Sequence, residues 1–381
     1  MLFIIKFANQ IMSKSQITFV YQSGRKDRLN SKGAFPQEFF YGFEYFKNVF
    51  DKYKIIEFNN KEFKNMRSQI SQFLEKISGL PFFMQKIINL ENYKIFKNSD
   101  VIVFTNQRVA ISTLPIVKYL NLYKNNKKIV YVMGLFNVVH KNNIKNFLRR
   151  FFIGVFVKNF DHLIFLSKGE YEFVKNNYSK FSSKFSFIPF SVDTTFWKDK
   201  NEKRKNNRIL FIGNDGKRDY DFAIDLANKL RDFEFIFVTN KIQQSPDLPP
   251  NITLHNGSWH ENLLTDSDIR NLYNSSCLTI IPLKESLQPS GQSVALQSMS
   301  CGTPVMITKT KGFWEIEKFE DQKNIFFISK NEVSIWAPNI INFFQNYKND
   351  ENLKKNIIQT IEENYSLDRF NSEIEKIIFN Y

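Results

Sequence analysis

Cysteine and histidine are scarce in this sequence. Its 381 residues include 2 cysteines, Cys277 and Cys301, and 4 histidines, and these side chains lie far apart along the chain. So few and so widely spaced ligands support neither a disulfide framework nor a zinc site, and free cysteines are typical of a reducing cytoplasm. We therefore expect a cytoplasmic protein with no metal site and no bound cofactor.

Long hydrophobic runs are absent as well. The apolar N-terminal stretch MLFIIKFANQIM is interrupted by Lys6 and is too short to span a bilayer. No small-residue cleavage site follows it, so a signal peptide is not expected, and Met12 is an alternative start. The pattern predicts a soluble protein or a peripheral protein on the inner face of the cytoplasmic membrane.

Acidic residues are outnumbered, and the formal net charge is +15. Between Val101 and Lys184 the only acids are Asp161, Glu170 and Glu172. The basic residues of the same stretch are Arg108, Lys118, Lys124, Lys127, Lys128, Lys141, Lys145, Arg149, Arg150, Lys158, Lys168, Lys175, Lys180 and Lys184. This excess favours an anionic partner, which could be a membrane surface, a nucleic acid or a phosphorylated substrate, but a solvated basic face explains it equally well.

The chain does contain a regular alternation of short apolar strands and helical segments, which is typical of parallel sheets covered by helices. Strands are expected at 16–22, 52–58, 100–106, 127–134, 162–167 and 184–193, and again at 209–214, 233–240, 252–257, 277–283 and 304–308. A polar stretch at 194–208 separates the two series and is interpreted as a linker. The length also favours two domains. We expect an N-terminal domain at 12–200, a C-terminal domain at 205–360, and a helix at 361–381 that can cross back to the N-terminal domain.

The stretch PSGQSVALQSMSCGTPV at 289–305 follows the expected strand at 277–283. A helix that follows a parallel strand directs its N-terminus to the carboxyl edge of the sheet, where its free N–H groups attract phosphate. Ser290, Gly291, Gln292 and Ser293 are neither acidic nor bulky, so they leave that backbone open to an anion. The alternative is an ordinary serine cap with a glycine turn.

A second phosphate-compatible loop follows the expected strand at 209–214. Gly213 ends this strand, and Lys217 and Arg218 lie just before a predicted helix. Basic residues at such a junction can neutralise a diphosphate, although a solvated Lys-Arg pair is the simpler interpretation. No G-x-G-x-x-G fingerprint or P-loop follows any strand, so a dinucleotide site is not indicated.

These two loops, together with DIRNLYNSSCLTIIPL and with IPFSVDTTFW before the linker, resemble the group-1, family-4-like glycosyltransferases of the GT-B fold. The resemblance covers roughly residues 160–370. It implies an α/β protein with two Rossmann-like domains facing each other across a cleft, and a nucleotide-sugar donor as co-substrate. The first half is similar only in pattern.

The resemblance also implies roles for individual residues. Gly213, Lys217 and Arg218 match the diphosphate-binding loop, and the segment from Ser290 to Val294 (Ser290, Gly291, Gln292, Ser293 and Val294) matches the loop that holds the phosphates and the donor sugar. Gln297 matches a ribose-binding position. Gly302, Thr303 and Pro304 match the G-x-P that ends the helix, and Gly312 with Glu315 matches the later G-x-x-E.

The sequence departs from the family pattern at several positions. Pro289 and Gln297 replace the two carboxylates of the family's E-x7-E, and Glu285 or Gln288 could compensate for the first. Met133 falls near the place of the N-domain histidine, and Asn214 replaces a common arginine. We interpret these departures as a trait of a subfamily. They leave the stereochemical outcome and turnover itself open.

The N-terminal half contains a candidate cleft loop and a basic amphipathic segment. Gly24 and Arg25 follow the first strand, where relatives carry a glycine-rich loop. They are candidate residues of the cleft between the domains, unless they belong to a basic surface loop.

The segment 141–160 forms a basic amphipathic helix that could dock on anionic lipid. Its apolar residues are Ile144, Phe147, Leu148, Phe151, Phe152 and Val155. We expect this stripe to pack on the sheet.

The sequence thus predicts a hexosyltransferase-like and retaining glycosyltransferase in cell-surface polysaccharide or glycolipid assembly. Its partners would be a nucleotide-sugar donor, a glycan or lipid-linked acceptor, and an anionic membrane surface, with no specific nucleic acid. One alternative is a sugar-nucleotide-binding pseudoenzyme without turnover. Another is a basic nucleic-acid-binding protein, which would show steep salt dependence.

Overall fold

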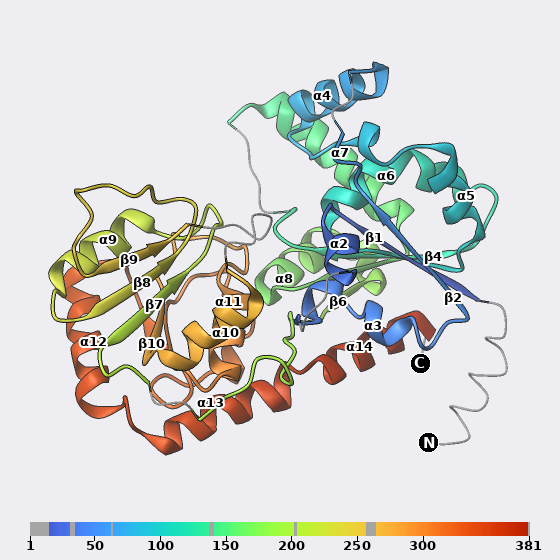
Figure 1. The fold of residues 1–381 in the computed structure, drawn as a ribbon. Coiled ribbons are helices and arrows are strands. Elements are labelled where there is room, and N and C mark those ends of the chain that lie inside the picture. Colours follow the sequence, from blue (N-terminus) through green and yellow to red (C-terminus); the bar gives the residue numbers. More distant parts are fainter. Residues whose placement is uncertain are drawn as a thin grey trace.

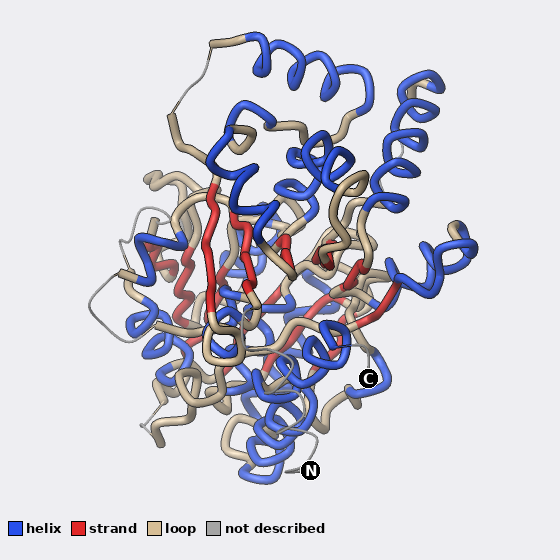
Figure 2. The backbone as a smooth tube through the Cα atoms, turned by 90° about the vertical axis from the view of Figure 1, so that its right-hand side faces the viewer, coloured by secondary structure: helices blue, strands red, loops and turns tan. Residues whose placement is uncertain are grey.

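Two parallel sheets form the framework of the protein (Figure 1). The computed structural model describes residues 15–30, 35–61, 64–136, 141–201, 204–256 and 264–379. The N-terminal stretch with the alternative start at Met12 lies outside these residues. Helices surround the strands of both sheets, as Figure 2 shows from the side.

The N-terminal sheet has the strand order β2-β1-β3-β4-β5-β6, and all neighbours in it are parallel. Its strands are β1 (Gln16–Tyr21), β2 (Lys52–Glu57), β3 (Val101–Phe104), β4 (Lys127–Val132), β5 (His162–Phe165) and β6 (Phe185–Phe187). The helices of this half are α2 (Arg25–Leu29), α3 (Phe43–Phe46), α4 (Met66–Ser78), α5 (Leu90–Asn98), α6 (Gln107–Leu120), α7 (Asn143–Asn159) and α8 (Lys168–Asn177). The central strand β3 is fully buried, which explains its unbroken apolar sequence.

The C-terminal sheet repeats this plan with the order β12-β11-β10-β7-β8-β9, again parallel throughout. Its strands are β7 (Arg208–Ile212), β8 (Glu234–Val238), β9 (Ile252–His255), β10 (Leu278–Ile281), β11 (Val305–Thr308) and β12 (Phe326–Ile328). The helices are α9 (Tyr220–Lys229), α10 (Asp266–Ser275), α11 (Gln292–Ser300), α12 (Val333–Asn346), α13 (Glu351–Asn364) and α14 (Leu367–Phe379). The predicted two Rossmann-like units are confirmed, whereas the short edge strand β12 was not anticipated.

The chain crosses between the domains twice, and the two crossings pair with each other. Val192 forms a parallel bridge with Ser366, and its N–H donates to the carbonyl of Tyr365 at 2.8 Å. After the second crossing α14 lies against the N-terminal domain, where Phe370 stacks on Tyr131 with ring centroids 5.9 Å apart. The C-terminal helix therefore contributes to the core of the first domain.

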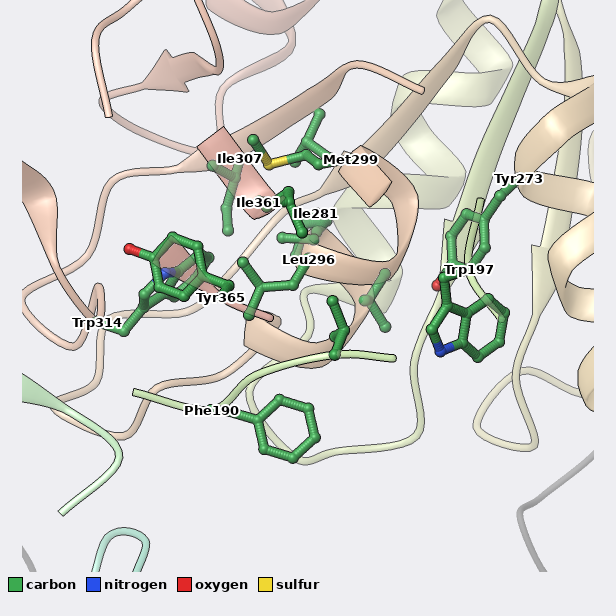
Figure 3. Packing of buried hydrophobic residues seen from close by; sticks show 14 of the residues in the cluster. Phe190, Trp197, Tyr273, Ile281, Leu296, Met299, Ile307, Trp314, Ile361 and Tyr365 are labelled. Atoms are coloured by element: carbon green, nitrogen blue, oxygen red, sulfur yellow. The ribbon is translucent and has the colours of Figure 1, made fainter. Parts of the chain in front are cut away.

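The first part of the stretch interpreted as a polar linker is buried. Phe196 and Trp197 are 6% and 1% exposed, and the indole of Trp197 packs edge-on against Tyr273 at 5.8 Å (Figure 3). The side chain of Asp193 shapes this turn, because it accepts hydrogen bonds from the backbone of Thr195 and Phe196. The segment thus joins the cores of the two domains.

None of the helices in the described parts of the chain combines the length and apolar character that crossing a membrane requires.

Candidate functional site

The loops that follow β7 and β10 lie side by side at the carboxyl ends of these strands. Arg218 and Leu283 form an isolated antiparallel bridge. The N–H of Asp219 donates to the carbonyl of Pro282 at 3.0 Å, and that of Lys284 donates to Lys217 at 2.8 Å. The structure therefore brings together the two loops that the sequence indicated separately.

The N-terminus of α11 is open at its first turn. Gly291 is the N-cap residue with φ 82°, no described side chain caps the helix, and no acidic residue lies in the first turn. A Cβ at Gly291 would lie 2.8 Å from Ile281 Cγ2, so a glycine is needed both for the conformation and for the close approach to β10. The first N–H groups of a helix have no intrahelical acceptor and can bind an anion.

Ser290 does not act as the ordinary helix cap that the simpler interpretation required. Its N–H donates to the carbonyl of Gln288 at 2.7 Å. The side chain is 7% exposed, and its buried Oγ has no hydrogen-bond partner among the residues that the structure describes. A buried hydroxyl without a partner is costly, which is the expected state of a group whose partner is a ligand.

Arg218 is buried beneath this helix terminus and is not a solvated surface residue. It is 3% exposed, its Nη1 donates to Asp215 Oδ2 at 2.8 Å, and its Nε donates to the carbonyl of Ile212 at 3.3 Å. A Cβ on Gly213 would lie 2.7 Å from Arg218 Nε, and one on Gly291 would lie 3.5 Å from Nη1. Both glycines thus make room for the guanidinium, which lies next to the open N–H groups and is paired with the Asp215 carboxylate.

Lys217 is half-buried beside the same loops. Its N–H donates to Asp215 Oδ1 at 2.8 Å, which holds the backbone of the loop. Within the described residues its ammonium group has no hydrogen bond or ion pair, and it is therefore available to an anionic ligand.

The N-terminal domain closes over this site. Gln292 Nε2 donates to the carbonyl of Leu166 at 3.4 Å, and Ser167 Oγ donates to that of Leu287 at 3.5 Å. A Cβ on Gly134 would lie 3.4 Å from the side chain of Gln288. The loops after β4 and β5 therefore face the first turn of α11 directly.

Gln297, the candidate ribose-binding residue, is 6% exposed and takes part in a contact between the domains. Its Oε1 accepts from the hydroxyl of Tyr273 at 3.2 Å, and its Nε2 donates to Glu38 Oε1 at 2.9 Å. Glu38 also accepts from Trp197 Nε1 at 2.6 Å and from the N–H of Asp193 at 3.3 Å. Burial, with a smaller contribution from the Asp193 charge, raises the pKa of Glu38 to about 7.

Sequence reasoning missed Glu38, because nothing local in QEFFYG distinguishes it from a surface acid. The one residue in the sequence that could have indicated this contact is Gln297, which replaces a carboxylate of the family pattern. A glutamine in place of a carboxylate can face a second carboxylate without repulsion.

The N-domain candidates Gly24 and Arg25 lie at the start of α2. Gly24 has φ 90°, and the Nε of Arg25 donates to the carbonyl of Phe39 at 3.2 Å while its N–H donates to Glu57. Burial lowers the pKa of Arg25. Its guanidinium thus forms contacts within the N-terminal domain. The neighbouring Arg28 forms an ion pair with Asp266 of α10, in the C-terminal domain.

The residues that could replace the family carboxylate at Pro289 have other contacts. Glu285 Oε1 accepts from the N–H of Lys311 at 3.0 Å, and Gln288 packs beside Gly134. Glu315 accepts from the hydroxyl of Tyr365 at 3.0 Å.

At the place of the expected histidine, Met133 donates its backbone N–H to Gln107 Oε1 at 3.0 Å. In the described parts of the chain no group of three or more His, Cys, Asp or Glu side chains could hold a metal ion.

Solved structures of similar fold are glycosyltransferases. A glycosyltransferase from Rickettsia africae ESF-5 is 16% identical with a TM-score of 0.67, and 96% of this chain covers 99% of that chain. Anabaena HepE, solved in complex with UDP and glucose, is 12% identical with a TM-score of 0.65 and coverage of 96% and 99%. The sucrose-phosphate synthase of Thermosynechococcus elongatus is 12% identical with a TM-score of 0.67 and coverage of 96% and 99%. The fold is GT-B.

The match to a sequence family covers a smaller part of the chain than the match to the solved structures. Residues 206–346 match the family model described as Glycosyl transferases group 1, so the C-terminal half carries a group 1 glycosyltransferase domain. This confirms the predicted resemblance for the half that contains Lys217 and α11. No curated protein matches the sequence.

Proposed function

We propose that this protein transfers a sugar from a nucleoside-diphosphate sugar to an acceptor hydroxyl, in the assembly of a cell-surface polysaccharide or glycolipid. The single observation that carries the proposal is the open first turn of α11, where the buried Ser290 Oγ has no partner in the described parts of the chain. Lys217 and the buried Arg218 place positive charge beside that turn. HepE, which has a similar fold, was solved with UDP-glucose, which favours a uridine diphosphate donor.

In the proposed mechanism the donor diphosphate lies on the N–H groups of the first turn of α11. The acceptor approaches from the loops after β4 and β5. Its hydroxyl oxygen bonds to the anomeric carbon as the bond to the diphosphate breaks, and the hydroxyl proton passes to the departing diphosphate. Negative charge develops on the departing diphosphate, where the helix terminus, Ser290 and Lys217 stabilise it in a site from which water is excluded. Arg218 supports this charge from below.

Retention of the anomeric configuration and transfer of a hexose are the finer parts of the proposal. They are supported by the resemblance to the family and by the group 1 domain. The nucleotide sugar is a co-substrate, and we propose that no further cofactor is required.

The test is a calorimetric titration of the full chain with UDP, GDP, ADP and dTDP, followed by the corresponding UDP-sugars if UDP binds. Lys217→Ala and Ser290→Ala should each weaken binding of the preferred diphosphate by about tenfold, because each removes one contact to phosphate. The control is Lys229→Ala, which removes an exposed lysine from the far end of α9. Equal binding by all four proteins, or no binding of any diphosphate, would contradict the proposal.

A pseudoenzyme that binds the donor without turnover is the second candidate. It is favoured by one observation, the engagement of Gln297 with Glu38 and Tyr273 at a position where the family has a free carboxylate. Tight binding of a UDP-sugar without hydrolysis or transfer, over a panel of glycan and lipid-linked acceptors, would support this candidate.

A further inference from the structure

Helix α4 buries three serines and leaves three large apolar side chains exposed. Its buried residues are Ser68, Ser71 and Ser78. Met66, Ile70 and Phe73, which follow one another at helical spacing, are 72%, 42% and 61% exposed. A helix on the surface of a water-soluble domain normally shows the opposite arrangement.

Helix α7 also exposes apolar side chains, in its first half. Arg149 lies on its buried side, where Nη1 donates to the carbonyl of Gly79 at 2.9 Å and Nη2 donates to that of Leu135 at 2.6 Å. Ile144, Phe147 and Phe151 are 71%, 69% and 58% exposed. The expectation that the apolar stripe packs on the N-terminal domain is confirmed for Phe152 and Val155, which lie against its core, and was wrong for the three exposed residues. The buried apolar residues of α7 are Ile153, Phe156 and Val157.

The two helices form one unit at the edge of the N-terminal domain. Gly79 is the residue that ends α4, so its bond to Arg149 ties the end of α4 to α7. Phe82 and Phe152 pack edge-on at 5.6 Å in the same region. Figure 1 shows α4 and α7 next to each other at the top of the N-terminal domain.

The charges around these apolar stripes are mostly positive. α7 contains no acidic residue and carries Lys145, Arg150 and Lys158, while α4 carries Arg67 and Lys76 against a single acid, Glu75. A second copy of this chain would bring like charges together, whereas an anionic bilayer supplies both a negative surface and an apolar interior.

We propose that the exposed faces of α4 and α7 dock this protein on anionic lipid bilayers. Phe147, Phe151 and Phe73 enter the boundary between headgroups and acyl chains, and the flanking lysines and arginines contact the lipid phosphates. This surface lies outside the donor site, so the proposal does not depend on the transferase function.

The test is co-sedimentation of the full chain with vesicles of phosphatidylcholine alone or of equal parts phosphatidylcholine and phosphatidylglycerol. Wild type should bind the anionic vesicles at least about tenfold more tightly than the neutral ones. The double variant Phe147→Ser/Phe151→Ser and the double variant Lys145→Gln/Arg150→Gln should each lose about tenfold of that affinity. Because these side chains are exposed or half-exposed, the variants should keep the fold, which circular dichroism would verify.

The matched control is Leu122→Ser/Tyr123→Ser, which removes two apolar side chains that are 72% and 70% exposed elsewhere on the same domain. Its vesicle binding should equal that of wild type. Equal binding of wild type and the phenylalanine variant would overturn the proposal. So would a dimer that the phenylalanine variant abolishes, if wild type does not bind the anionic vesicles.

Discussion

Two glycines determine how closely a helix terminus can approach a buried guanidinium. Gly213 leaves room for Arg218 Nε, and Gly291 leaves room for Ile281 below the first turn of α11. Because α11 begins directly above these contacts, a side chain at either glycine would lift the N–H groups away from a bound phosphate. The proposed site therefore depends on the absence of two methyl groups as much as on the presence of Lys217.

Gly291→Ala should destabilise the protein and weaken diphosphate binding. Alanine at φ 82° costs about 1–2 kcal/mol, and the contact with Ile281 adds to this cost. Urea denaturation and the calorimetric titration would measure the two effects. Gly216→Ala is the control, since nothing lies within 4 Å of a Cβ there, and it should leave stability within about 0.5 kcal/mol of wild type. A similar loss in both variants would contradict this account.

Some site residues could be predicted from the sequence, and others could not. The capacity of the loops at Lys217 and Ser290 to bind an anion follows from small, polar and basic residues at strand–helix junctions. Such residues can be recognised in the sequence without knowledge of the fold. The contact between Glu38 and Gln297 joins positions that are distant in the chain and belong to different domains. No local pattern encodes such a pair.

At the scale of elements, the strands were predictable because each is a short buried apolar run in a parallel sheet. The unbroken run Val101–Phe104 is one example. The surface of α7 was not predictable in this way. Apolar residues cover more than one side of that helix, and the sequence alone does not say which side meets the sheet. In the structure Arg149 lies on the buried side of α7, because its guanidinium donates to two backbone carbonyls there.

Helix α14 contributes to the stability of the domain to which it returns. Phe370 is 2% exposed and stacks on Tyr131 of β4. Phe370→Ala should therefore lower the free energy of unfolding by about 3–5 kcal/mol, as measured by urea denaturation. Glu373→Ala, on the exposed side of the same helix, should change it by less than about 0.5 kcal/mol. A loss below about 1 kcal/mol for Phe370→Ala would show that α14 is dispensable for the N-terminal domain.

At the scale of the whole molecule, one buried carboxyl group links three parts of the chain. Glu38 belongs to the N-terminal domain, Trp197 follows the first crossing, and Gln297 lies on α11. Because burial raises the pKa of Glu38 from 4.5 to about 7, the folded protein binds more protons than the unfolded chain between these values. The contribution of Glu38 to stability is therefore complete at low pH and decreases as the pH rises to about 7.

Glu38→Gln should remove this pH dependence and keep an acceptor for Trp197 and Gln297. Relative to the variant, wild type should lose about 3 kcal/mol of unfolding free energy between pH 4.5 and about 7. Urea denaturation of both proteins across this range measures the difference. Parallel pH profiles would contradict the shifted pKa of Glu38.

Val192 and Ser366 pair where the chain passes twice between the domains, and we expect this pair to act as the hinge between them. Two adjacent connections that share a hydrogen bond resist sliding and twisting, and rotation about their common line strains them least. Glu38 binds the residue next to Val192 and would move little, whereas the first turn of α11 would swing away from the ends of β4 and β5. Opening and closing of the donor site would then be described by one angle.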